Sequence, residues 1–303
     1  MNTFLNDIKT GFDKPNNMLI KLLLINILVF VPMFLISNIF PNVGLGGVYN
    51  TIIRLVAIPA PLGEFIYRPW TIITYFFLHE GFFHILFNML NLYYFGQLIQ
   101  EYLGHKKLFG LYMMGGLAGG LMYLLAYNFI PFYADRADMA IMLGASASVL
   151  AIIVAAATLL PDFTFFLILL GPVRIKWIAL VLVLLSVSGI TGGNAGGNLA
   201  HMGGAIFGFI YIRQLQRGTD LARPIIGAWD WINNLFAPKP KVKVTYRSTS
   251  SSRASASEPK QKTAKGAPSQ DEIDRILDKI AQNGYENLSK EEKQKLFRAS
   301  QND

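Results

Sequence analysis

The chain has 303 residues, of which 52% are hydrophobic and only 15% are charged, whereas soluble globular domains carry roughly a quarter charged residues. It contains no cysteine, which excludes disulfides and cysteine-ligated metal sites. The formal net charge of +8 comes from basic residues beside apolar segments and in a polar tail, so we expect a lipid bilayer and no nucleic acid as partner.

Six apolar segments follow one another along the chain, and a bilayer-spanning helix needs about 20 such residues. We predict membrane spans at residues 18–40, 82–100, 108–130, 143–160, 176–188 and 199–214. The first span carries one charge, Lys21. A cleaved signal peptide is the alternative, but the apolar stretch is too long and no small-residue cleavage site follows it. The glycine- and asparagine-rich residues 189–198 separate the last two spans, which are shorter than the ideal length.

The spans predict an all-α fold, a polytopic six-transmembrane-helix bundle over residues 18–216, preceded by a cytoplasmic segment at residues 1–17. Within this bundle, residues 163–173 are apolar but too short for a span, so we expect an interfacial or extended connection there. Residues 217–269 are expected to form a basic linker, and residues 238–269 are rich in Lys, Ser, Ala and Pro without apolar periodicity.

Lysine and arginine residues near the ends of the spans predict the orientation. With a cytoplasmic N-terminus, ten of them flank the inner ends: Lys9, Lys14, Lys21, Lys106, Lys107, Arg174, Lys176, Arg213, Arg217 and Arg223. Three lie in the outer connections: Arg54, Arg68 and Arg136. This bias predicts an integral, multi-pass membrane protein with both termini in the cytoplasm, and we expect it in the plasma (inner) membrane.

The C-terminal tail, residues 270–303, is predicted to be a small soluble helical hairpin. Its hydrophobic residues recur at helical spacing: Ile273, Ile276, Leu277 and Ile280. Two pairs fit the capping-box pattern: Ser269 with Glu272, and Ser289 with Glu292. We therefore expect helices at about 270–282 and 289–299, with Gly284 ending the first. The hairpin is either a weakly folded solvated appendage or a docking element for a cytoplasmic partner or for the membrane domain.

Polar side chains inside a bilayer are costly and usually functional. Four lie in the outer parts of three predicted spans: His84, Asn88, Ser146 and His201. A serine hydroxyl needs an adjacent base to become a nucleophile, and a histidine that titrates near neutrality can take its proton. We therefore predict a Ser146–His201 dyad. Gly204 and Gly208 form a small-xxx-small pair that would let the sixth span approach its neighbours closely.

An oxyanion formed at Ser146 would need preorganised hydrogen-bond donors. His84 and Asn88 are four residues apart, so their side chains share one helix face, and both can donate hydrogen bonds. The main-chain N–H of Ser146, at the start of a helix, adds a donor with a favourable dipole direction. Gly144 permits a close approach of backbone or substrate just before the serine.

These residues resemble the motifs of the rhomboid family. The motifs are Gly144-Ala145-Ser146-Ala147 for G-x-S-G, His84-Ile85-Leu86-Phe87-Asn88 for H-x-x-x-N, and Ala200-His201-Met202-Gly203-Gly204 with Gly208 for A-H-x-x-G-x-x-x-G. In order and spacing, the resemblance covers about residues 18–216. It implies an intramembrane serine endopeptidase in which Ser146 is the nucleophile and His201 the base, without a cofactor. His84, Asn88 and the Ser146 amide would line the oxyanion hole.

The resemblance further implies substrates that are transmembrane helices, cleaved near the outer membrane face after local unwinding. It also implies that residues 41–80 form a partly membrane-embedded loop. Two departures from the family pattern are visible. Ala147 replaces the glycine that usually follows the serine, and Thr71 follows Trp70 where the family has an arginine. We expect Arg68 to compensate for the missing arginine.

Each candidate residue also has a structural interpretation. Ser146 fits a small packing position, His201 a buried histidine bonded to a carbonyl, and the pair His84 and Asn88 a polar contact that holds the first loop. Zinc would need a third ligand, and no H-E-x-x-H helix occurs, so no metal is expected. A catalytically silent rhomboid-like binder of transmembrane clients is the main alternative function. A transporter is less favoured, because inverted repeats and midplane polar groups are missing.

Overall fold

The computed structural model describes residues 16–167, 170–236, 270–283 and 288–299. Its contacts divide the chain into two compact units, residues 1–239 and 240–303. The first unit contains the apolar helices and both small sheets, whereas the second contains the two C-terminal helices. The first unit therefore carries every residue predicted for the catalytic site.

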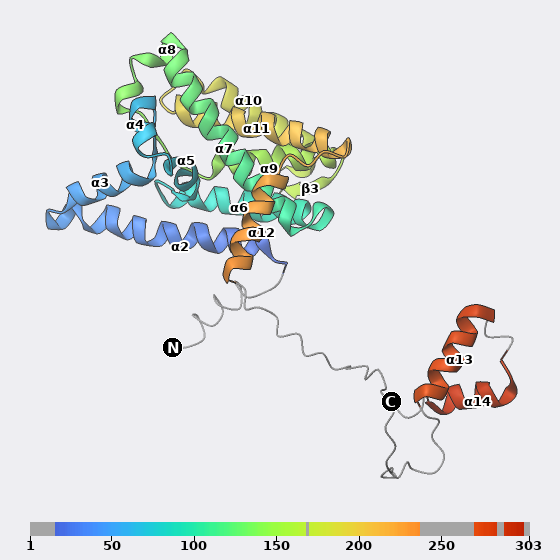
Figure 1. The fold of residues 1–303 in the computed structure, drawn as a ribbon. Helices are drawn as coiled ribbons and strands as arrows, with labels where there is room; N and C mark the ends of the chain where they lie inside the picture. Colours follow the sequence, from blue (N-terminus) through green and yellow to red (C-terminus); the bar gives the residue numbers. More distant parts are fainter. Residues whose placement is uncertain (1–15, 168–169, 237–269, 284–287, 300–303) are drawn as a thin grey trace, which may run out of the picture. The chain divides into compact units, whose positions relative to one another are not determined.

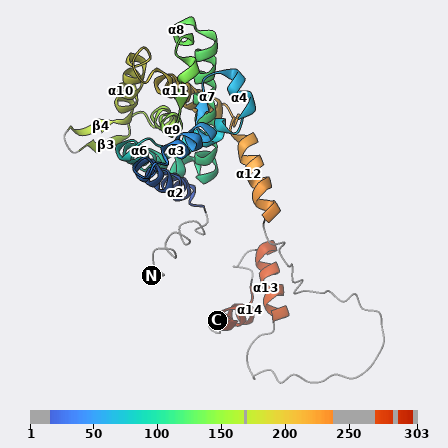
Figure 2. The ribbon, with the colours of Figure 1, turned by 90° about the vertical axis from the view of Figure 1, so that its left-hand side faces the viewer.

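Each predicted span corresponds to a helix of the first unit. These helices are α2 (Met18–Ile39), α6 (Phe82–Leu103), α7 (His105–Phe129), α9 (Ser146–Leu159), α10 (Ile175–Ser188) and α11 (Ala195–Gln216). Figures 1 and 2 both show α9 in the middle of the bundle, surrounded by α6, α7, α10 and α11. The helix that begins at Ser146 is thus the central element of the fold.

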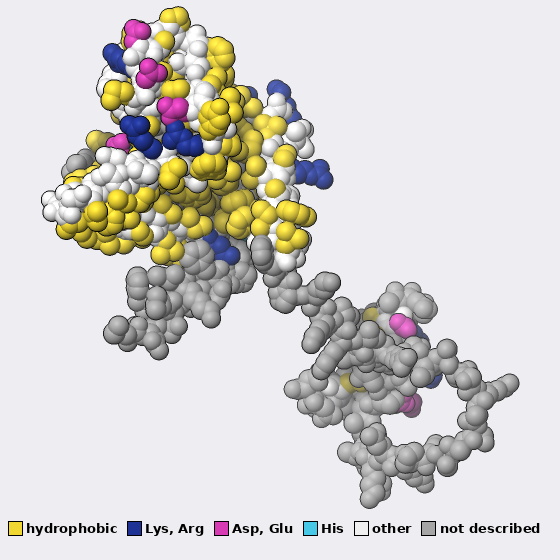
Figure 3. Space-filling model, turned by 60° about the vertical axis from the view of Figure 1, so that its left-hand side comes forward, with side chains coloured by type: hydrophobic (Ala, Val, Ile, Leu, Met, Phe, Trp, Pro, Cys, Tyr) yellow, Lys and Arg dark blue, Asp and Glu magenta, His cyan; other side chains and the backbone are white. Residues whose placement is uncertain are grey.

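Two stretches of the described chain, Met18–Val43 and His105–Phe129, are long and apolar enough to cross a membrane by length and composition. Helices α9 and α10 are apolar but have only 14 residues each, or about 21 Å at 1.5 Å per residue. A bilayer core is about 30 Å thick. The helical bundle is confirmed, whereas the count of six spans stays a prediction. Figure 3 shows hydrophobic side chains covering most of one face of this unit.

Residues 41–80 form a folded insertion between α2 and α6. It contains helices α3 (Gly46–Val56), α4 (Leu62–Tyr67) and α5 (Thr71–Thr74), with the short 3-10 helices η1 (Pro41–Val43) and η2 (Tyr75–Phe77). Trp70 Nε1 donates to the carbonyl of Leu55 at 2.8 Å. Arg68 donates to the carbonyl of Arg54 and pairs with Glu64. Arg68 and Trp70 thus hold α4 and α5 against the end of α3.

Two small antiparallel sheets accompany the helices of this predominantly helical unit. Strand β1 (Ile58–Pro59) pairs with β2 (Ile141–Met142), and β3 (Thr164–Leu167) pairs with β4 (Gly171–Arg174). Between α7 and β2, the chain forms α8 (Pro131–Ala134) and the 3-10 helix η3 (Ala137–Met139). Within the predicted connection at residues 163–173, the described residues 164–167 and 171–173 are extended and paired, which agrees with the extended alternative.

An ion-pair cluster holds the β3–β4 hairpin against the start of α10. Lys176 Nζ lies 2.7 Å from Asp162 Oδ1, and Arg174 Nη1 lies 3.3 Å from the same oxygen. The hydrogen bond from Lys176 lowers the pKa of the Asp162 carboxyl below its ordinary value, with smaller contributions from Arg174. All three side chains are more than a third exposed, so the cluster defines the geometry of the turn more than it stabilises the fold.

Glycines let α11 approach the central helix within backbone contact. A Cβ atom on Gly204 would lie 2.1 Å from the carbonyl oxygen of Ala147, and one on Gly208 would lie 2.2 Å from that of Ala151. On the α7 side, a Cβ on Gly119 would lie 2.5 Å from the Cβ of Ala147. Helices packed this closely gain dispersion contacts that larger side chains would prevent. The glycines therefore determine the separation between α11 and α9.

Helix α12 (Arg223–Phe236) corrects the predicted linker. We expected residues 217–269 to form a linker throughout, but residues 223–236 are a helix that contacts α7. The Trp229 ring lies 4.7 Å from the ring of Phe109, and Lys106 Nζ lies 2.6 Å from Asp230 Oδ2. An apolar stripe at helical spacing explains why this segment folds. The rest of the linker, residues 237–269, lies outside the described residues.

The second unit contains α13 (Gln270–Asn283) and α14 (Lys290–Ala299), close to the two predicted helices. The capping box at Ser289 is confirmed: its hydroxyl accepts from the Glu292 N–H at 3.2 Å, and its own N–H donates to Glu292 Oε2 at 2.8 Å. A hydrogen bond from Lys279 lowers the pKa of Glu292, and the bonds from Ser289 add to the effect. The predicted roles of Ser269 and Gly284 lie outside the described residues.

Candidate functional site

Ser146 is the first residue of α9 and follows a turn that only glycine adopts readily. Gly144 has φ of +132°, a backbone conformation that side chains with a Cβ rarely adopt. A Cβ there would also lie 3.0 Å from Cε1 and 3.1 Å from Nε2 of His84. The main-chain N–H of Gly144 donates to the carbonyl of Tyr75 at 2.9 Å. Gly144 thus lets the His84 ring approach the turn that presents Ser146.

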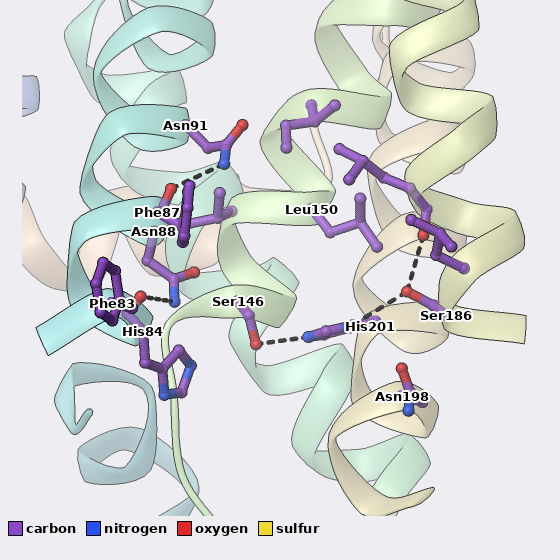
Figure 4. A pocket seen from close by; sticks show the side chains of 14 residues that line it. Phe83, His84, Phe87, Asn88, Asn91, Ser146, Leu150, Ser186, Asn198 and His201 are labelled. Atoms are coloured by element: carbon purple, nitrogen blue, oxygen red, sulfur yellow. Dashed lines mark hydrogen bonds between the residues drawn. The ribbon is translucent and has the colours of Figure 1, made fainter. Parts of the chain in front are cut away.

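The structure brings Ser146 and His201 into direct contact. Nε2 of His201, on α11, lies 2.6 Å from Oγ of Ser146, on α9 (Figure 4). His201 stands one turn before Gly204, so the close packing of α11 on α9 brings the imidazole to the hydroxyl. A hydroxyl and a ring nitrogen at this distance share a hydrogen bond through which a proton can pass.

A second serine contacts the other nitrogen of the same imidazole. Oγ of Ser186, on α10, lies 3.1 Å from Nδ1 of His201 and donates to the carbonyl of Leu182 at 3.0 Å. Ser186 was not among the residues predicted from the sequence. The available signal was a hydroxyl in the mostly apolar segment 176–188, which also contains Ser188, but such a serine more often bonds its own helix. Only the packing of α10 beside α11 shows that Ser186 meets His201.

His84 and Asn88 line the side of the site opposite α11 (Figure 4). The Asn88 amide donates one hydrogen to the carbonyl of His84 at 2.8 Å, which leaves its second N–H available. The His84 ring packs edge-on against His79, with centroids 5.2 Å apart. As the first residue of α9, Ser146 has a main-chain N–H without an acceptor inside the helix. The side chains of His84 and Asn88 therefore line the same cavity as Ser146, whose own N–H is a further potential donor.

Two cavities meet at the Ser146 hydroxyl. The first, of about 430 Å³, is lined mainly by apolar side chains of α6, α9 and α10, with His201 and Asn198 from α11. The second, also about 430 Å³, is lined by residues before α9, by the end of α7 and by the turn before α11. His84, Ser146 and His201 line both. A bound chain could therefore pass the serine with one part in apolar surroundings and the other in polar surroundings.

The acidic residues Glu64 and Glu80 do not hydrogen-bond to the imidazole. Glu80 lines the second cavity, and Glu64 pairs with Arg68 in the residue 41–80 insertion. Within the described residues, no carboxylate bonds to His201, whose two ring nitrogens contact only the hydroxyls of Ser146 and Ser186. No group of three or more His, Asp or Glu side chains gathers within the described ranges in a way that could hold a metal ion.

Comparison with known proteins places the site in a family. Residues 67–217 match the model of the rhomboid domain, and residues 263–302 match a family of unknown function, DUF6576. The chain is 31% identical over 160 residues to "RHOMBOID-like protein 12, mitochondrial" of Arabidopsis thaliana, which covers 50% of this chain and 48% of that protein. It is 27% identical over 171 residues to "Presenilin-associated rhomboid-like protein A, mitochondrial" of Danio rerio, covering 54% and 42%.

The matched segments span less than half the length of either relative. The rhomboid-domain match at residues 67–217 includes the helices that carry Ser146 and His201, and it agrees with the resemblance drawn from the three motifs. Members of this family are integral membrane proteins. The chain therefore belongs to the rhomboid family, with its rhomboid domain at residues 67–217.

Proposed function

We propose that this protein is an intramembrane serine endopeptidase that cleaves transmembrane-helix substrates near the outer membrane face. The observation that carries the proposal is the 2.6 Å contact between Ser146 Oγ and His201 Nε2, on the walls of two cavities. A serine paired with a histidine in this way is the arrangement that nucleophilic acyl transfer requires. Membership of the rhomboid family supports the same reaction class.

The reaction would proceed in two acyl-transfer steps. Ser146 Oγ attacks the carbonyl carbon of the scissile peptide while its proton passes to Nε2 of His201. The imidazolium then returns this proton to the leaving amine nitrogen as the C–N bond breaks, which leaves an acyl ester on Ser146. Water, deprotonated by His201, hydrolyses the ester and restores the hydroxyl.

The charge that develops on the substrate carbonyl oxygen would be stabilised by fixed donors. The Ser146 N–H points from the positive end of α9, and the side chains of His84 and Asn88 lie on the other side of the serine. Donors held in place before reaction need no reorganisation when charge appears, which makes this contribution large in an environment of low polarity. The missing side chain at Gly144 leaves room for the His84 ring close to the serine.

The substrate class follows from the two cavities. Phe83 and Phe87 of α6 and Leu182 and Leu185 of α10 give the first cavity an apolar wall, which suits hydrophobic side chains of a substrate segment. The second cavity contains Glu80 and Asn194, and it would admit the water that hydrolysis needs. A transmembrane helix would have to unwind locally to lay an extended peptide bond across the serine.

The proposed topology has six spans with both termini in the cytoplasm, so the serine lies in the outer half of the membrane. Basic residues at the inner ends of the predicted spans support this orientation. We propose the plasma (inner) membrane as the location. The two relatives named above are described as mitochondrial. That location is a property of those relatives and is not part of the proposal for this chain.

The decisive experiment is incubation of the purified full chain with a panel of single-span membrane proteins. We expect a cleavage product and labelling by a serine-directed fluorophosphonate probe with the wild type, and neither with Ser146→Ala. The matched control is Ser148→Ala, because Ser148 lies two residues further along α9 and its buried hydroxyl has no hydrogen-bond partner in the described part of the chain.

Equal products from wild type and Ser146→Ala would overturn the proposal. Binding of single-span proteins by both forms, without cleavage or probe labelling in either, would establish the silent binder instead. Cleavage by wild type and Ser148→Ala only would assign the reaction to the Ser146 hydroxyl.

A further inference from the structure

We propose that Ser186 is a positioning residue that fixes the protonation pattern of His201; this inference rests on the protease function proposed above. The two ring nitrogens of a neutral imidazole are not equivalent, because one carries a hydrogen and the other a lone pair. Only the form with its lone pair on Nε2 can take the proton of Ser146. A group that binds Nδ1–H selects this form.

The position of the Ser186 hydroxyl hydrogen determines whether Ser186 is the donor or the acceptor in its hydrogen bond with His201. That single hydrogen is donated to the carbonyl of Leu182 at 3.0 Å. With its hydrogen on that carbonyl, Ser186 Oγ offers a lone pair to His201 Nδ1, 3.1 Å away, and favours the tautomer that has its hydrogen on Nδ1. In that tautomer, Nε2 presents a lone pair to the Ser146 hydroxyl 2.6 Å away.

Ser186 is suited to this role because it cannot easily move. It is only 5% exposed, and both its donor and its acceptor positions are used. During the reaction, His201 becomes an imidazolium by accepting the Ser146 proton, and Ser186 Oγ continues to accept the Nδ1 hydrogen. No proton passes to Ser186. Its effect is to orient the ring and to stabilise the charged form through a hydrogen bond.

The test compares Ser186→Ala, Ser186→Thr and the control Ser188→Ala. Ser188 lies on the same helix and also donates to a carbonyl of its own helix, that of Leu185 at 2.8 Å, but it is exposed. In Ser186→Ala we expect kcat to fall roughly 10- to 100-fold, the range for losing the partner that orients a functional histidine, with KM unchanged. Ser186→Thr retains the hydroxyl and should restore most of kcat, and Ser188→Ala should match the wild type.

Wild-type kcat in Ser186→Ala, or equal loss in the alanine and threonine variants at equal thermal stability, would overturn the inference. A change confined to KM would also overturn it, because an orienting role acts on the chemical step. Absence of cleavage in the wild type would count against the proposed function itself, so the two failures are distinguishable.

A separate observation concerns a pair of adjoining cavities beside α12, which none of the proposed catalytic residues line. The larger has a volume of about 520 Å³ and an almost wholly apolar wall. Its lining includes Met18 and Lys21 of α2, Ile73 of α5, Phe77 of η2, Phe109 of α7 and Trp229 of α12. These residues come from α2, α5, η2, α7 and α12, so the cavity extends along α2 and α7 from the predicted cytoplasmic end of the bundle.

The smaller cavity, of about 200 Å³, is polar and shares Met18, Lys21, Phe109 and Trp229 with the larger one. Lys106 also lines it, but its ammonium group is paired with Asp230 at 2.6 Å. Lys21 has no ion pair among the described residues, so its positive charge remains available at the junction of the two cavities. The polar cavity, with its available cation, thus shares part of its wall with the apolar one.

We infer that these cavities hold one anionic phospholipid, with an acyl chain in the apolar cavity and the phosphate beside Lys21. Charge complementarity supports this occupant, since basic pockets between membrane helices on the cytoplasmic side bind anionic head groups. The neighbouring α12 has the character of an interfacial helix, with Trp229 between the polar and apolar parts. The site does not depend on protease activity.

Thermal unfolding of the purified full chain in a mild detergent tests this inference. Added phosphatidylglycerol should raise Tm by a few degrees when it is present well above its Kd, whereas phosphatidylcholine and inorganic phosphate should not. Lys21→Gln should remove the rise, and Lys107→Gln should retain it, because Lys107 lines neither cavity. An equal rise with phosphatidylcholine, a rise with inorganic phosphate, or a rise unaffected by Lys21→Gln would each overturn the inference.

Discussion

Replacing His201 by glutamine is expected to lower kcat for a cleaved substrate by roughly 10³-fold or more, the size of effect seen when a member of a serine–histidine unit is removed. Glutamine keeps a polar side chain but cannot carry a proton from Ser146 to the leaving amine. The expected loss is large because Nε2 is the only base within hydrogen-bond distance of Ser146 Oγ in the described part of the chain.

The measurement is single-turnover cleavage by His201→Gln, Ser146→Ala and the double variant. Groups that act as one unit are strongly non-additive, so the double variant should be no slower than the slower single variant. His105→Gln is the control, because His105 is at the start of α7 and lines neither cavity around Ser146. Multiplicative losses in the double variant would mean that the two residues act independently, contrary to the dyad.

Adding one methyl group at Gly208 is expected to destabilise the bundle and to reduce activity together. The Cβ of Gly208→Ala would lie 2.2 Å from the main-chain oxygen of Ala151, an atom that cannot rotate away. Overpacking of this kind costs about 1–3 kcal/mol, and occasionally more. Because α11 also carries His201, moving this helix away from α9 lengthens the contact with Ser146.

Thermal unfolding and cleavage rate should be measured on Gly208→Ala and Gly204→Ala, with Gly227→Ala as the matched control. Gly227 lies inside α12, where a Cβ would meet nothing within 4 Å. Its replacement should leave the cleavage rate unchanged and Tm unchanged or slightly higher, since alanine favours a helix by about 0.5–1 kcal/mol over glycine. A Gly208→Ala protein as stable and active as the wild type would show that α11 and α9 are not held at this separation.

The sequence predicted the helices of the bundle because long apolar stretches and a lack of charged residues can be recognised along the chain without knowledge of its contacts. All six predicted spans contain helices, and α7 (His105–Phe129) matches the prediction of 108–130 within a few residues. The motif residues Ser146 and His201 could be chosen because polar groups are rare in such segments. Their partners were harder to predict, because the hydroxyl of Ser186 could equally have bonded only its own helix.

Two parts of the first unit were predicted less well, for different reasons. Helix α12 was assigned to the linker because its apolar residues lie among polar ones. These apolar residues form a stripe on one side of the helix, and the structure shows that α12 packs on α7. The β3–β4 hairpin has no alternation of polar and apolar residues, so its short apolar strands could not be told from an interfacial segment by periodicity.

By itself, the amino-acid sequence determined the six apolar helical segments of the bundle, the polar residues within them, and which of those could supply a nucleophile and a base. These properties depend on residue type and spacing along one chain. The tertiary structure alone decided that Ser186 reaches Nδ1 of His201, that Gly144 admits the His84 ring, and that α12 closes two cavities. Such contacts join residues from different helices, and their distances depend on how closely the helices pack rather than on any local pattern.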